Sequence, residues 1–341
     1  MDRGARTITI IDVAAKAGVS VPTVSRVLTG AARVSEKRRR LVLDAIEELG
    51  FRPSAAARML ASRRTKAIGV LAGDTSHYGY AETIRGIELA ARAEGHTVSI
   101  TLIESADEDA VERSVALTLT QALSGVIVLK FDPAGEAALE RLPSDLPVVA
   151  LSGVPSPNFP QVLMAEEEAA AELTTRLLEL GHRTVHHVRI PPGNHEDGRT
   201  TGWRRALTDA GAPVPAVLDA TWEPISGVRI GRALAATPDM TAVLCGNDEI
   251  AMGVMRGLGE MGLRVPADVS VVGFDDHPLA QIWMPSLTTA RQDFADLGAR
   301  GVKLLMQAAD QTEEVGHSVA HPTVIWRESA APPRVTSEAG E

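Results

Sequence analysis

The stretch that runs from residue 9 to residue 26 constrains the fold of this chain most, because it carries start and stop signals for two consecutive short helices. Thr9 followed by Asp12 is typical of a capping box, so a helix is expected to begin there. Gly18 supplies the permissive backbone that ends such a helix in a tight turn. Ser20 is a good N-cap for a second helix, and Pro22 is tolerated in its first turn. The pattern predicts a helix-turn-helix.

Each of the two helices has an apolar side and an outer side. The residues expected to pack between the helices are Val13, Ala14, Ala17, Val24, Val27 and Leu28. The outer face of the second helix then presents Val21, Pro22, Ser25 and Arg26, near the end that a recognition helix inserts into a major groove. Arg26 has the chemistry to bind a guanine through two hydrogen bonds. The alternative interpretation of this segment is an ordinary helical hairpin with a surface arginine.

The charge of the chain is divided between its two parts. Residues 1–66 carry 14 lysines and arginines against 6 aspartates and glutamates, a net charge of +8. The remaining residues hold 20 of the 34 basic and 38 of the 44 acidic side chains, a net charge of −18. A basic head suits nucleic-acid phosphates, whereas an acidic body is repelled by them. The two parts are therefore expected to have different partners.

Two further segments complete the basic part. Ser35 is expected to cap a third helix that continues through Leu49 and ends at Gly50, with Phe51 filling the small core. The basic run 37–40 on this helix is interpreted as a solvated face, which could contact backbone phosphates when the head is bound to a DNA duplex. Residues 53–66 form a short helical segment or a plain linker; as a helix with little apolar surface, it is expected to become ordered only with DNA and a partner chain.

From residue 67 onward, short apolar runs alternate with helical patterns, which indicates parallel sheets covered by helices. The expected strands are Ala67–Leu71, Thr97–Leu102, Val126–Leu129, Val148–Leu151, Val185–Ile190, Ala216–Ala220, Ala242–Cys245 and Ser270–Phe274. The expected helices are Ile84–Glu94, Ala110–Leu123, Glu167–Leu180, Gly202–Ala210, Gly227–Ala236 and Asp248–Met261. Two doubly wound halves are implied, with a ligand in the cleft at the carboxyl ends of their strands. The polar and aromatic residues expected at that cleft are Asp74, Tyr80, Arg199, Trp222, Asn247, Asp248 and Asp275.

Length and composition limit the class of protein. A chain of 341 residues, 45% of them hydrophobic, is expected to fold as several units. It contains no apolar run near the roughly 20 residues that span a bilayer, and its start lacks the apolar centre of a signal peptide, so a cytoplasmic location without membrane attachment is expected. The single Cys245 excludes an intrachain disulfide framework.

Three motif-like strings do not indicate sites. The Gly257-x-Gly-x-x-Gly262 string lies late in an expected helix and is interpreted as a loosened helix end, not as a dinucleotide fingerprint. The histidines at 182, 186, 187 and 195 do not share a face, so no metal site is predicted. The acidic run 166–168 opens a helix, where acids suit the helix dipole.

The chain resembles the lactose-repressor and galactose-repressor family of bacterial transcription regulators along nearly its whole length. In the head the resemblance rests on Asp12-Val-Ala-x-x-Ala-Gly-Val-Ser-x-x-Thr-Val-Ser-Arg-Val-Leu28, with Val34-Ser35 and Gly50-Phe-x-Pro53 following in order. In the body it rests on Gly181-His182, Arg199-x-x-Gly-Trp203, Asn247-Asp248-x-x-Ala251, Val271-Val-Gly-Phe-Asp-Asp276, Pro285-x-Leu-Thr-Thr289 and Gln292-x-Phe294. It implies a helix-turn-helix head and a periplasmic-binding-protein-like core of two doubly wound parallel-sheet subdomains.

The resemblance also implies a homodimer that binds a palindromic double-stranded operator. The linker would fold as a hinge helix in the central minor groove, where Leu60 matches the family's wedge. The DNA-binding residues that carry over are Thr9, Ser20, Val21, Pro22, Thr23, Ser25, Arg26, Ala57 and Leu60. Val21 and Pro22 offer only apolar contacts, where relatives often have polar side chains.

For the body, the resemblance implies a small effector between the subdomains. Arg199 matches an arginine that holds ligand hydroxyls or an anion, Asn247 and Asp275 match hydroxyl-binding groups, and Trp222 and Phe294 match positions that stack on the ligand. The expected effector-binding residues are Asp74, Tyr80, Ser152, Arg199, Trp222, Asn247, Asp275, Gln292 and Phe294. Such a set suits a sugar or a nucleoside. Ser152-Gly153 stands where many relatives have an aspartate, which removes a charged acceptor.

Simpler interpretations exist for several of these residues. Asp248 is expected to cap the helix that follows it, Asp275 and Asp276 are possible loop acids, and Trp222 is a possible core aromatic. The rival classes are an enzyme of sugar metabolism or a ligand-binding or transport protein with the same core. The chain lacks a nucleophile elbow and a phosphate loop, so no catalytic residue, metal or cofactor is predicted.

The expected organisation is a DNA-binding domain over residues 1–52, a hinge or linker over 53–66, and an effector-binding and dimerisation core over 67–330. Within the core, an N-subdomain is expected over about 67–162 and 292–320, and a C-subdomain over about 163–291 and 321–330. The tail 331–341 is expected to be disordered. The sequence thus predicts an allosteric transcription regulator, a repressor that senses a carbohydrate or nucleoside and is not an enzyme.

Overall fold

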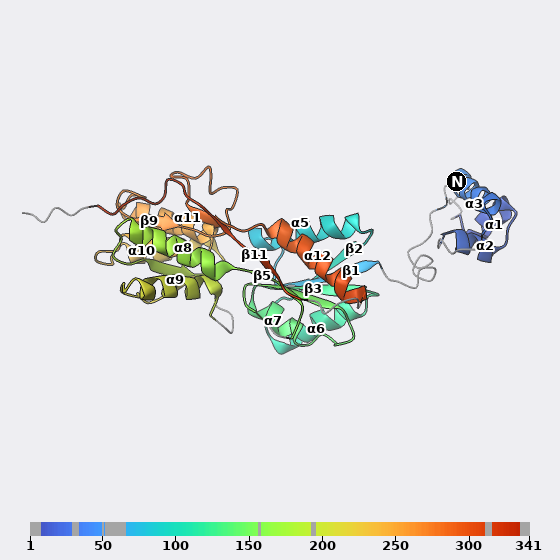
Figure 1. Cartoon of the computed structure of the whole chain (residues 1–341), viewed down its shortest axis with the longest axis horizontal. Helices are drawn as coiled ribbons and strands as arrows, with labels where there is room; N and C mark the ends of the chain where they lie inside the picture. Colours follow the sequence, from blue (N-terminus) through green and yellow to red (C-terminus); the bar gives the residue numbers. More distant parts are fainter. Residues whose placement is uncertain are drawn as a thin grey trace, which may run out of the picture. The chain divides into compact units, whose positions relative to one another are not determined.

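A computed structural model describes residues 8–28, 34–49, 51, 66–155, 158–191, 196–310 and 316–334. The chain divides into two compact units, Met1–Lys66 and Ala67–Glu341. Figure 1 draws the first unit in blue and the second from cyan to red. The predicted hinge residues Ala57 and Leu60 lie outside the described residues.

The first unit contains the predicted helix-turn-helix and the helix that follows it. Its helices are α1 (Ile10–Ala17), α2 (Val21–Leu28) and α3 (Glu36–Leu49). The Asp12 carboxylate accepts hydrogen bonds from the Thr9 amide at 2.8 Å and the Thr9 hydroxyl at 2.7 Å. Gly18 has a φ of +63°, the left-handed conformation that ends α1. The local signals in the sequence therefore fix both ends of α1.

The small core of the head forms where the three helices meet. Val13, Val24 and Val42 are fully buried, and Phe51 packs against them. The expectation that Leu28 faces the first helix is wrong, because its side chain is 36% exposed. Leu28 is the last residue of α2 and lies at the rim of a core whose centre Val24 and Val27 already fill.

The second unit begins with a parallel six-stranded sheet in the order β11-β5-β4-β3-β1-β2. Its strands are β1 (Ala67–Ala72), β2 (Thr97–Leu102), β3 (Gly125–Lys130), β4 (Val148–Ser152), β5 (Gln161–Met164) and β11 (Ser318–Ala320). Helices α5 (Tyr78–Ala93) and α12 (Phe294–Asp310) cover one face, and α6 (Glu108–Leu119) and α7 (Pro133–Leu139) cover the other (Figure 1). We refer to this part as the N-subdomain.

The C-subdomain has a parallel four-stranded sheet in the order β7-β6-β8-β9. Its strands are β6 (His186–Arg189), β7 (Leu218–Asp219), β8 (Ala242–Cys245) and β9 (Ser270–Val272). Its helices are α8 (Glu166–Glu179), α9 (Gly198–Asp209), α10 (Pro224–Leu234) and α11 (Asp248–Glu260). An antiparallel pair, β10 (Thr289–Arg291) with β12 (Thr323–Ile325), lies beside it. The predicted fold class of two doubly wound parallel-sheet subdomains is confirmed.

The chain passes between the subdomains three times, after β5, between β10 and α12, and between β11 and β12. The sequence did not predict β5, β10, β11, β12, α7 or α12. Because β5 belongs to the first sheet, the N-subdomain extends to Met164, beyond the expected boundary at 162. The expected strand Ala216–Ala220 is reduced to two residues in β7.

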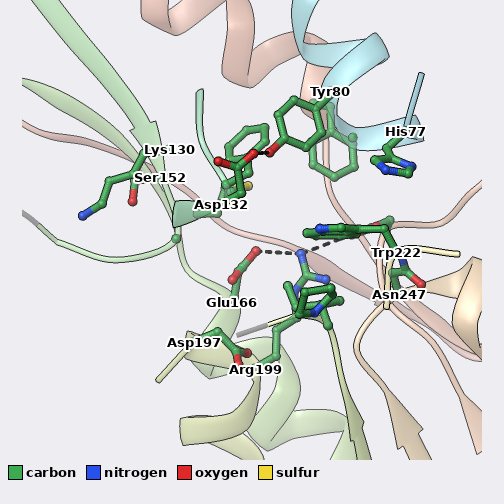
Figure 2. A pocket seen from close by; sticks show the side chains of 18 of the residues that line it. His77, Tyr80, Lys130, Asp132, Ser152, Glu166, Asp197, Arg199, Trp222 and Asn247 are labelled. Atoms are coloured by element: carbon green, nitrogen blue, oxygen red, sulfur yellow. Dashed lines mark hydrogen bonds and ion pairs between the residues drawn. The ribbon is translucent and has the colours of Figure 1, made fainter. Parts of the chain in front are cut away.

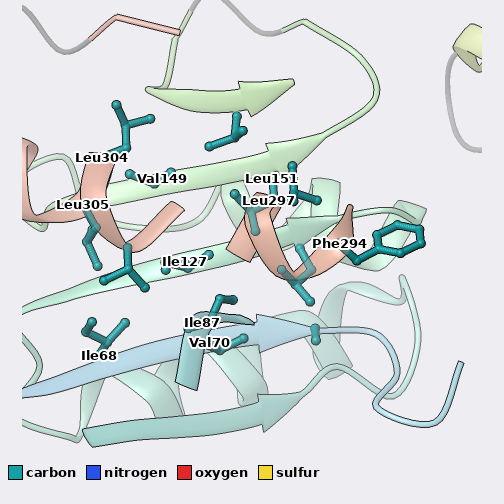
Figure 3. Packing of buried hydrophobic residues seen from close by; sticks show 14 of the residues in the cluster. Ile68, Val70, Ile87, Ile127, Val149, Leu151, Phe294, Leu297, Leu304 and Leu305 are labelled. Carbon is teal, nitrogen blue, oxygen red and sulfur yellow. The ribbon is translucent and has the colours of Figure 1, made fainter. Parts of the chain in front are cut away.

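The core of the N-subdomain explains why its strands read as continuous apolar runs. Ile68, Val70, Ile127, Val149 and Leu151 are fully buried between the sheet and the helices. Figure 3 shows them against Leu297, Leu304 and Leu305 of α12 and Ile87 of α5. Strands covered on both faces exclude water on both sides, so alternation with polar residues is lost. Among the described residues, no helix combines the length and the apolar character that crossing a membrane requires.

Helices α10 and α11 approach each other so closely that glycines stand at their contact. A methyl group added at Gly231 would lie 2.4 Å from the Val254 carbonyl oxygen, and one added at Gly257 would lie 2.2 Å from the Val228 oxygen. The interpretation of Gly257 as part of a loosened helix end is therefore wrong. Gly259 has nothing within 4 Å of such a position, and Gly262 takes a φ of +84° after the helix.

We predict that Gly231→Ala lowers the free energy of unfolding by about 1–3 kcal/mol, because backbone atoms of α11 must move to admit the methyl group. Gly259→Ala is the matched control in α11 and should be neutral or stabilise by about 0.5–1 kcal/mol, since the methyl group meets nothing and alanine favours a helix. Urea unfolding of the two variants and the wild type measures both. Equal changes in the free energy of unfolding in the two variants would contradict a close contact of Gly231 with helix α11.

Candidate functional site

The outer face of α2 is the candidate DNA-reading surface of the head. Val21, Pro22 and Arg26 are exposed, and Thr23 and Ser25 are partly exposed. The Ser20 and Thr23 hydroxyls lie 2.9 Å apart at the start of α2, and Thr9 is exposed at the start of α1. The structure thus places the seven described residues of the predicted DNA-binding set, Thr9, Ser20, Val21, Pro22, Thr23, Ser25 and Arg26, at the ends of helices or on the outer face of α2.

The second candidate site is a cavity of about 120 Å³ between the two subdomains of the body. Segments that follow strands or begin helices form its walls, as expected for parallel sheets. The polar and aromatic residues that line it are His77, Tyr78, Tyr80, Lys130, Phe131, Asp132, Glu136, Ser152, Glu166, Asp197, Arg199, Trp222, Asn247, Glu249, Asp275 and Phe294. Figure 2 labels wall residues from both subdomains, with Tyr80 and Asp132 on one side and Glu166, Arg199 and Asn247 on the other.

On the wall formed by the N-subdomain, a buried tyrosine is paired with a carboxylate. The Tyr80 hydroxyl donates to Asp132, which also accepts from the Gly135 amide at 2.8 Å and so caps α7. Burial and the adjacent Asp132 raise the pKa of Tyr80 above its ordinary value. Lys130, on the same wall, forms an ion pair with Glu136 at 3.2 Å. This wall therefore offers an aromatic surface beside carboxylates that are already held in place.

The wall formed by the C-subdomain is built around Arg199, which is 6% exposed. Its Nη2 donates to Glu166 Oε1 at 2.8 Å and lies 3.5 Å from Asp275 Oδ1, and its Nη1 donates to the Gly246 carbonyl. The guanidinium carbon lies 4.5 Å from the centre of the Phe274 ring. Burial lowers the pKa of Arg199, but Glu166 and Asp275 outweigh burial and raise it. The guanidinium is therefore a fixed cation in the cavity wall.

Asp275 reaches the cavity from a strained backbone. Its φ is +106°, and that of Asp276 is +56°, both in the region that non-glycine residues rarely adopt. Burial raises the pKa of Asp275 to about 6, although Arg199 and a 2.9 Å hydrogen bond from Gln292 Nε2 act in the opposite direction. Strain of this kind persists where surrounding contacts hold it.

Asp248 supplies one of those contacts, and its predicted role as a helix cap is wrong. The cap of α11 is Asn247, whose side-chain oxygen accepts from the Ile250 amide at 2.8 Å. Asp248 is buried and accepts from the His277 amide at 2.7 Å and the Thr289 hydroxyl at 2.6 Å. Burial raises the pKa of Asp248 well above its usual range. Its carboxylate therefore anchors the loop that carries Asp275.

Two aromatic contacts cross the cleft between the subdomains. The rings of His77 and Trp222 stack with centres 5.4 Å apart, and Tyr78 meets His277 edge-on at 4.7 Å. Tyr78 also contacts Phe294 edge-on at 5.8 Å. Trp222 lies at the cavity and is partly exposed, so its alternative interpretation as an ordinary core aromatic is wrong.

Seven of the nine predicted effector-binding residues lie on the cavity wall: Tyr80, Ser152, Arg199, Trp222, Asn247, Asp275 and Phe294. Asp74 does not; its carboxylate accepts from the backbone amides of Ser76 and His77 and forms a turn. Gln292 is not among the wall residues either; its side-chain amide donates a hydrogen bond to Asp275 Oδ1 at 2.9 Å. The Ser152 hydroxyl bonds within its own loop, to the Val154 amide and carbonyl.

Several wall residues were not predicted from the sequence, above all Glu166, Asp132 and His77. The acidic run 166–168 does open α8, but Glu166 is buried against Arg199, while its neighbour Glu167 pairs with the exposed Arg205. No sequence signal separates these two glutamates. Asp132 carried a usable signal, since an aspartate between an apolar strand and a proline is typical of a helix cap at a strand end.

The histidine cluster has structural contacts of its own. His187 is buried, with Nδ1 3.0 Å from the Leu244 carbonyl and Nε2 3.0 Å from the Thr200 hydroxyl. His182 lies near Thr241, Ser270 and the Ala331 carbonyl. Groups of three or more side chains suited to a metal are absent from the part of the chain that the structure describes, and His195 lies outside it.

A helix-turn-helix head joined to a two-subdomain body with a ligand-sized cleft defines a ligand-responsive regulator of transcription. Residues 9–54 match the model for bacterial regulatory proteins of the lacI family, and residues 174–330 match the periplasmic binding protein-like domain. The chain belongs to the lacI family of bacterial regulatory proteins and is a DNA-binding transcriptional regulator.

The similar proteins extend over nearly the whole chain. The catabolite control protein A of Priestia megaterium is 34% identical over 307 residues, which span 87% of this chain and 91% of the relative. The lactose operon repressor of Escherichia coli (strain K12) is 30% identical, over 96% and 92%. The crystal structure of the lac repressor dimer bound to operator and the anti-inducer ONPF matches with a TM-score of 0.86 at 30% identity, covering 96% of this chain and all of that one.

We predict that His187 makes stability fall in mild acid. Burial lowers the pKa of His187 from 6.5 to about 4, so between these pH values the unfolded chain binds a proton that the folded chain excludes. The free energy of unfolding should therefore fall by about 3 kcal/mol as the pH drops from 6.5 towards 4. Denaturant unfolding of the wild type and of His187→Gln is measured across this pH range. The difference between their free energies of unfolding at each pH gives the contribution of His187.

The variant is needed as a reference because Asp275 changes the free energy of unfolding with pH in the opposite direction. Its pKa is raised from 3.8 to about 6, so the folded chain binds the extra proton there and gains stability as the pH falls. Asp275 is present in both proteins, and its effect cancels in the difference. If the free energy of unfolding changes with pH in the same way for the wild type and His187→Gln, His187 is not the group from which the folded chain excludes a proton.

Proposed function

We propose that this protein is a repressor that binds a palindromic operator as a homodimer and responds to a small sugar or nucleoside bound in the cleft. The observation that carries the proposal is the cavity itself, where a fixed arginine, strand-end carboxylates and aromatic rings converge from both subdomains. Residues 1–52 would read DNA, residues 53–66 would form the hinge, and residues 67–330 would bind the effector and the second copy. The relatives are repressors, and we take the cleft to act by binding, not by catalysis.

The chemistry of the wall supports a ligand with several hydroxyl groups. The Asn247 side-chain oxygen is used by the Ile250 amide, which leaves its NH₂ group to face a ligand. Asp275 supplies an acceptor, and Tyr80, Trp222 and Phe294 supply aromatic surface. Hydroxyl groups both donate and accept, and the carbon face of a sugar or the ring of a base packs on aromatic side chains.

We propose that the effector acts by changing how the subdomains close. The two aromatic contacts across the cleft, His77 with Trp222 and Tyr78 with His277, would be kept or broken according to what the cavity holds. A ligand that binds one closure better shifts the population toward it. The shift would alter the spacing of the two heads in the dimer and so favour or oppose operator binding. A cytoplasmic location fits this role.

Selection of bound sequences from a random DNA duplex pool, with and without a mixture of sugars and nucleosides, tests the function. A recovered palindrome whose yield changes with an added compound is expected. Recovery of no enriched sequence under either condition would contradict the proposal and favour a ligand-binding role for the body alone.

Arg26→Ala should relax base choice at one position in each half-site, at a cost of about 1–3 kcal/mol of discrimination, because Arg26 is exposed in the last turn of α2. Arg40→Ala on α3 is the control: it should weaken binding to all sequences alike and reduce the salt dependence. Binding to the selected operator and to single-base variants of it measures both. Uniform weakening by Arg26→Ala would exclude a base contact.

Exposed apolar residues in both subdomains support a second copy as the partner. On the N-subdomain, β2 is the edge of its sheet and exposes Ile100 and Leu102 at 44% and 46%. On the C-subdomain, the loop after β9 exposes Ile282 at 72% and Met284 at 93% beside a groove along α11. An unpaired edge and an apolar loop of this kind are typical of interfaces. The similar lac repressor structure is a dimer.

Met284→Glu should weaken the homodimer by about tenfold or more, since a charge placed in an apolar contact must be desolvated. Val214→Glu, the same kind of change on an exposed apolar residue away from both regions, is the control. Sedimentation equilibrium measures the dissociation constants. A dimer that tolerates Met284→Glu as well as Val214→Glu would place the interface elsewhere.

A further inference from the structure

The guanidinium of Arg199 has few donors left for a ligand. Nη2 is taken by Glu166 and lies near Asp275, and Nη1 is taken by the Gly246 carbonyl. Of the three guanidinium nitrogens, Nε is the one that is buried without a hydrogen-bond partner among the described residues. A phosphate or carboxylate binds arginine best through two adjacent donors. On both edges of this guanidinium at least one of the two nitrogens already donates to the Glu166 carboxylate or to the Gly246 carbonyl, so an anion would have to compete for it. A single hydroxyl oxygen needs only one donor.

The carboxylate that occupies Arg199 is held by the local packing. Glu166 is 5% exposed at the start of α8. A methyl group added at Gly153, after β4, would lie 2.6 Å from Glu166 Oε2. The absence of a side chain at Gly153 therefore leaves room for the Glu166 carboxylate, which comes from a different element. Figure 2 shows Glu166 pointing to Arg199 at the cavity.

The remaining charges of the wall are also unfavourable for an anion. Six carboxylates line the cavity, those of Asp132, Glu136, Glu166, Asp197, Glu249 and Asp275, against Lys130 and Arg199. Both cations have carboxylate partners, Lys130 with Glu136 at 3.2 Å and Arg199 with Glu166 at 2.8 Å. An entering anion would have to displace a buried ion pair and meet a negative field concentrated in the cleft.

We propose that Glu166 acts as a charge filter that reserves the cleft for effectors without a phosphate or carboxylate group. The proposal rests on the cleft being the effector site, and it makes Glu166 the residue that determines this specificity. The ligand class is a polyhydroxylated compound that is neutral or carries an amine, because its hydroxyl or amine hydrogens can donate to the wall carboxylates.

Inorganic phosphate is a probe that needs no knowledge of the effector. The full-length protein is titrated with phosphate, against chloride of equal ionic strength, and thermal denaturation and tryptophan fluorescence are followed. The wild type should show no saturable response, whereas Glu166→Gln should bind phosphate at least about tenfold more tightly than any binding seen in the wild type. The reason is that a neutral amide oxygen competes for Arg199 Nη2 more weakly than a carboxylate does, and that one negative charge leaves the wall.

Glu167→Gln is the matched control: it removes the same charge from the adjacent residue, which pairs with the exposed Arg205 instead of Arg199. It should behave as the wild type does. Adding Arg199→Gln to Glu166→Gln should abolish the gained phosphate binding. Binding of phosphate by the wild type as tightly as by Glu166→Gln would overturn the proposal.

Gly153→Ala provides a second route that keeps Glu166 in the chain. The added methyl group displaces the Glu166 carboxylate from Arg199, so this variant should also gain phosphate binding. If Glu166→Gln fails to fold, as judged by circular dichroism, phosphate binding by Gly153→Ala is compared with that of the wild type, and equal binding by the two would overturn the proposal. Operator binding is measured on the same preparations. If the wild type binds no operator, the proposed function is contradicted, while the comparison of phosphate binding between the wild type and the variants still tests the charge filter.

Discussion

The buried guanidinium of Arg199 is the group on which the wall of the C-subdomain depends. It joins the starts of α8 and α9 through Glu166, and it joins the ends of β8 and β9 through Gly246 and Asp275. A buried cation without partners is strongly unfavourable, so each of these segments must be in place before Arg199 can be enclosed. One side chain thus fixes four separate segments of the chain around a cavity.

A second set of contacts holds the loop that carries Asp275. Asp248 accepts from the His277 amide and the Thr289 hydroxyl, and Asp276 is paired with Arg291 at 2.7 Å and Arg327 at 2.6 Å. These bonds keep two aspartates in a backbone conformation that they would otherwise avoid. The same loop contacts Tyr78 through His277, so the ligand-facing loop of one subdomain is linked to the other. This arrangement suits a protein that converts occupancy of a cleft into relative movement of two subdomains.

The sequence predicted the fold class and most of the elements, and it placed seven of nine chosen side chains at the cavity. The failures are informative. Asp74 and Gln292 are polar residues near strand ends, as the pattern required, yet their side chains complete a turn and support Asp275. Asn247, and not Asp248, caps α11, and Asn247 also lines the cavity, whereas Asp248 holds the loop that carries Asp275. Glu166 and Glu167 are neighbours with the same chemistry, but one is buried and the other is only partly buried.

The sequence by itself determined the features that depend on neighbouring residues. The capping of α1 by Thr9 and Asp12, the turn at Gly18, the apolar runs of the strands and the division of charge at residue 66 all follow from local composition and spacing. The tertiary structure alone decided which side chains meet across the cleft, because the crossovers of parallel sheets bring together segments that are far apart in the chain. The pairing of Arg199 with Glu166, the space left by Gly153 and the stacking of His77 on Trp222 belong to this second kind. No local pattern encodes them, since their energy depends on burial that exists only after the two subdomains have formed.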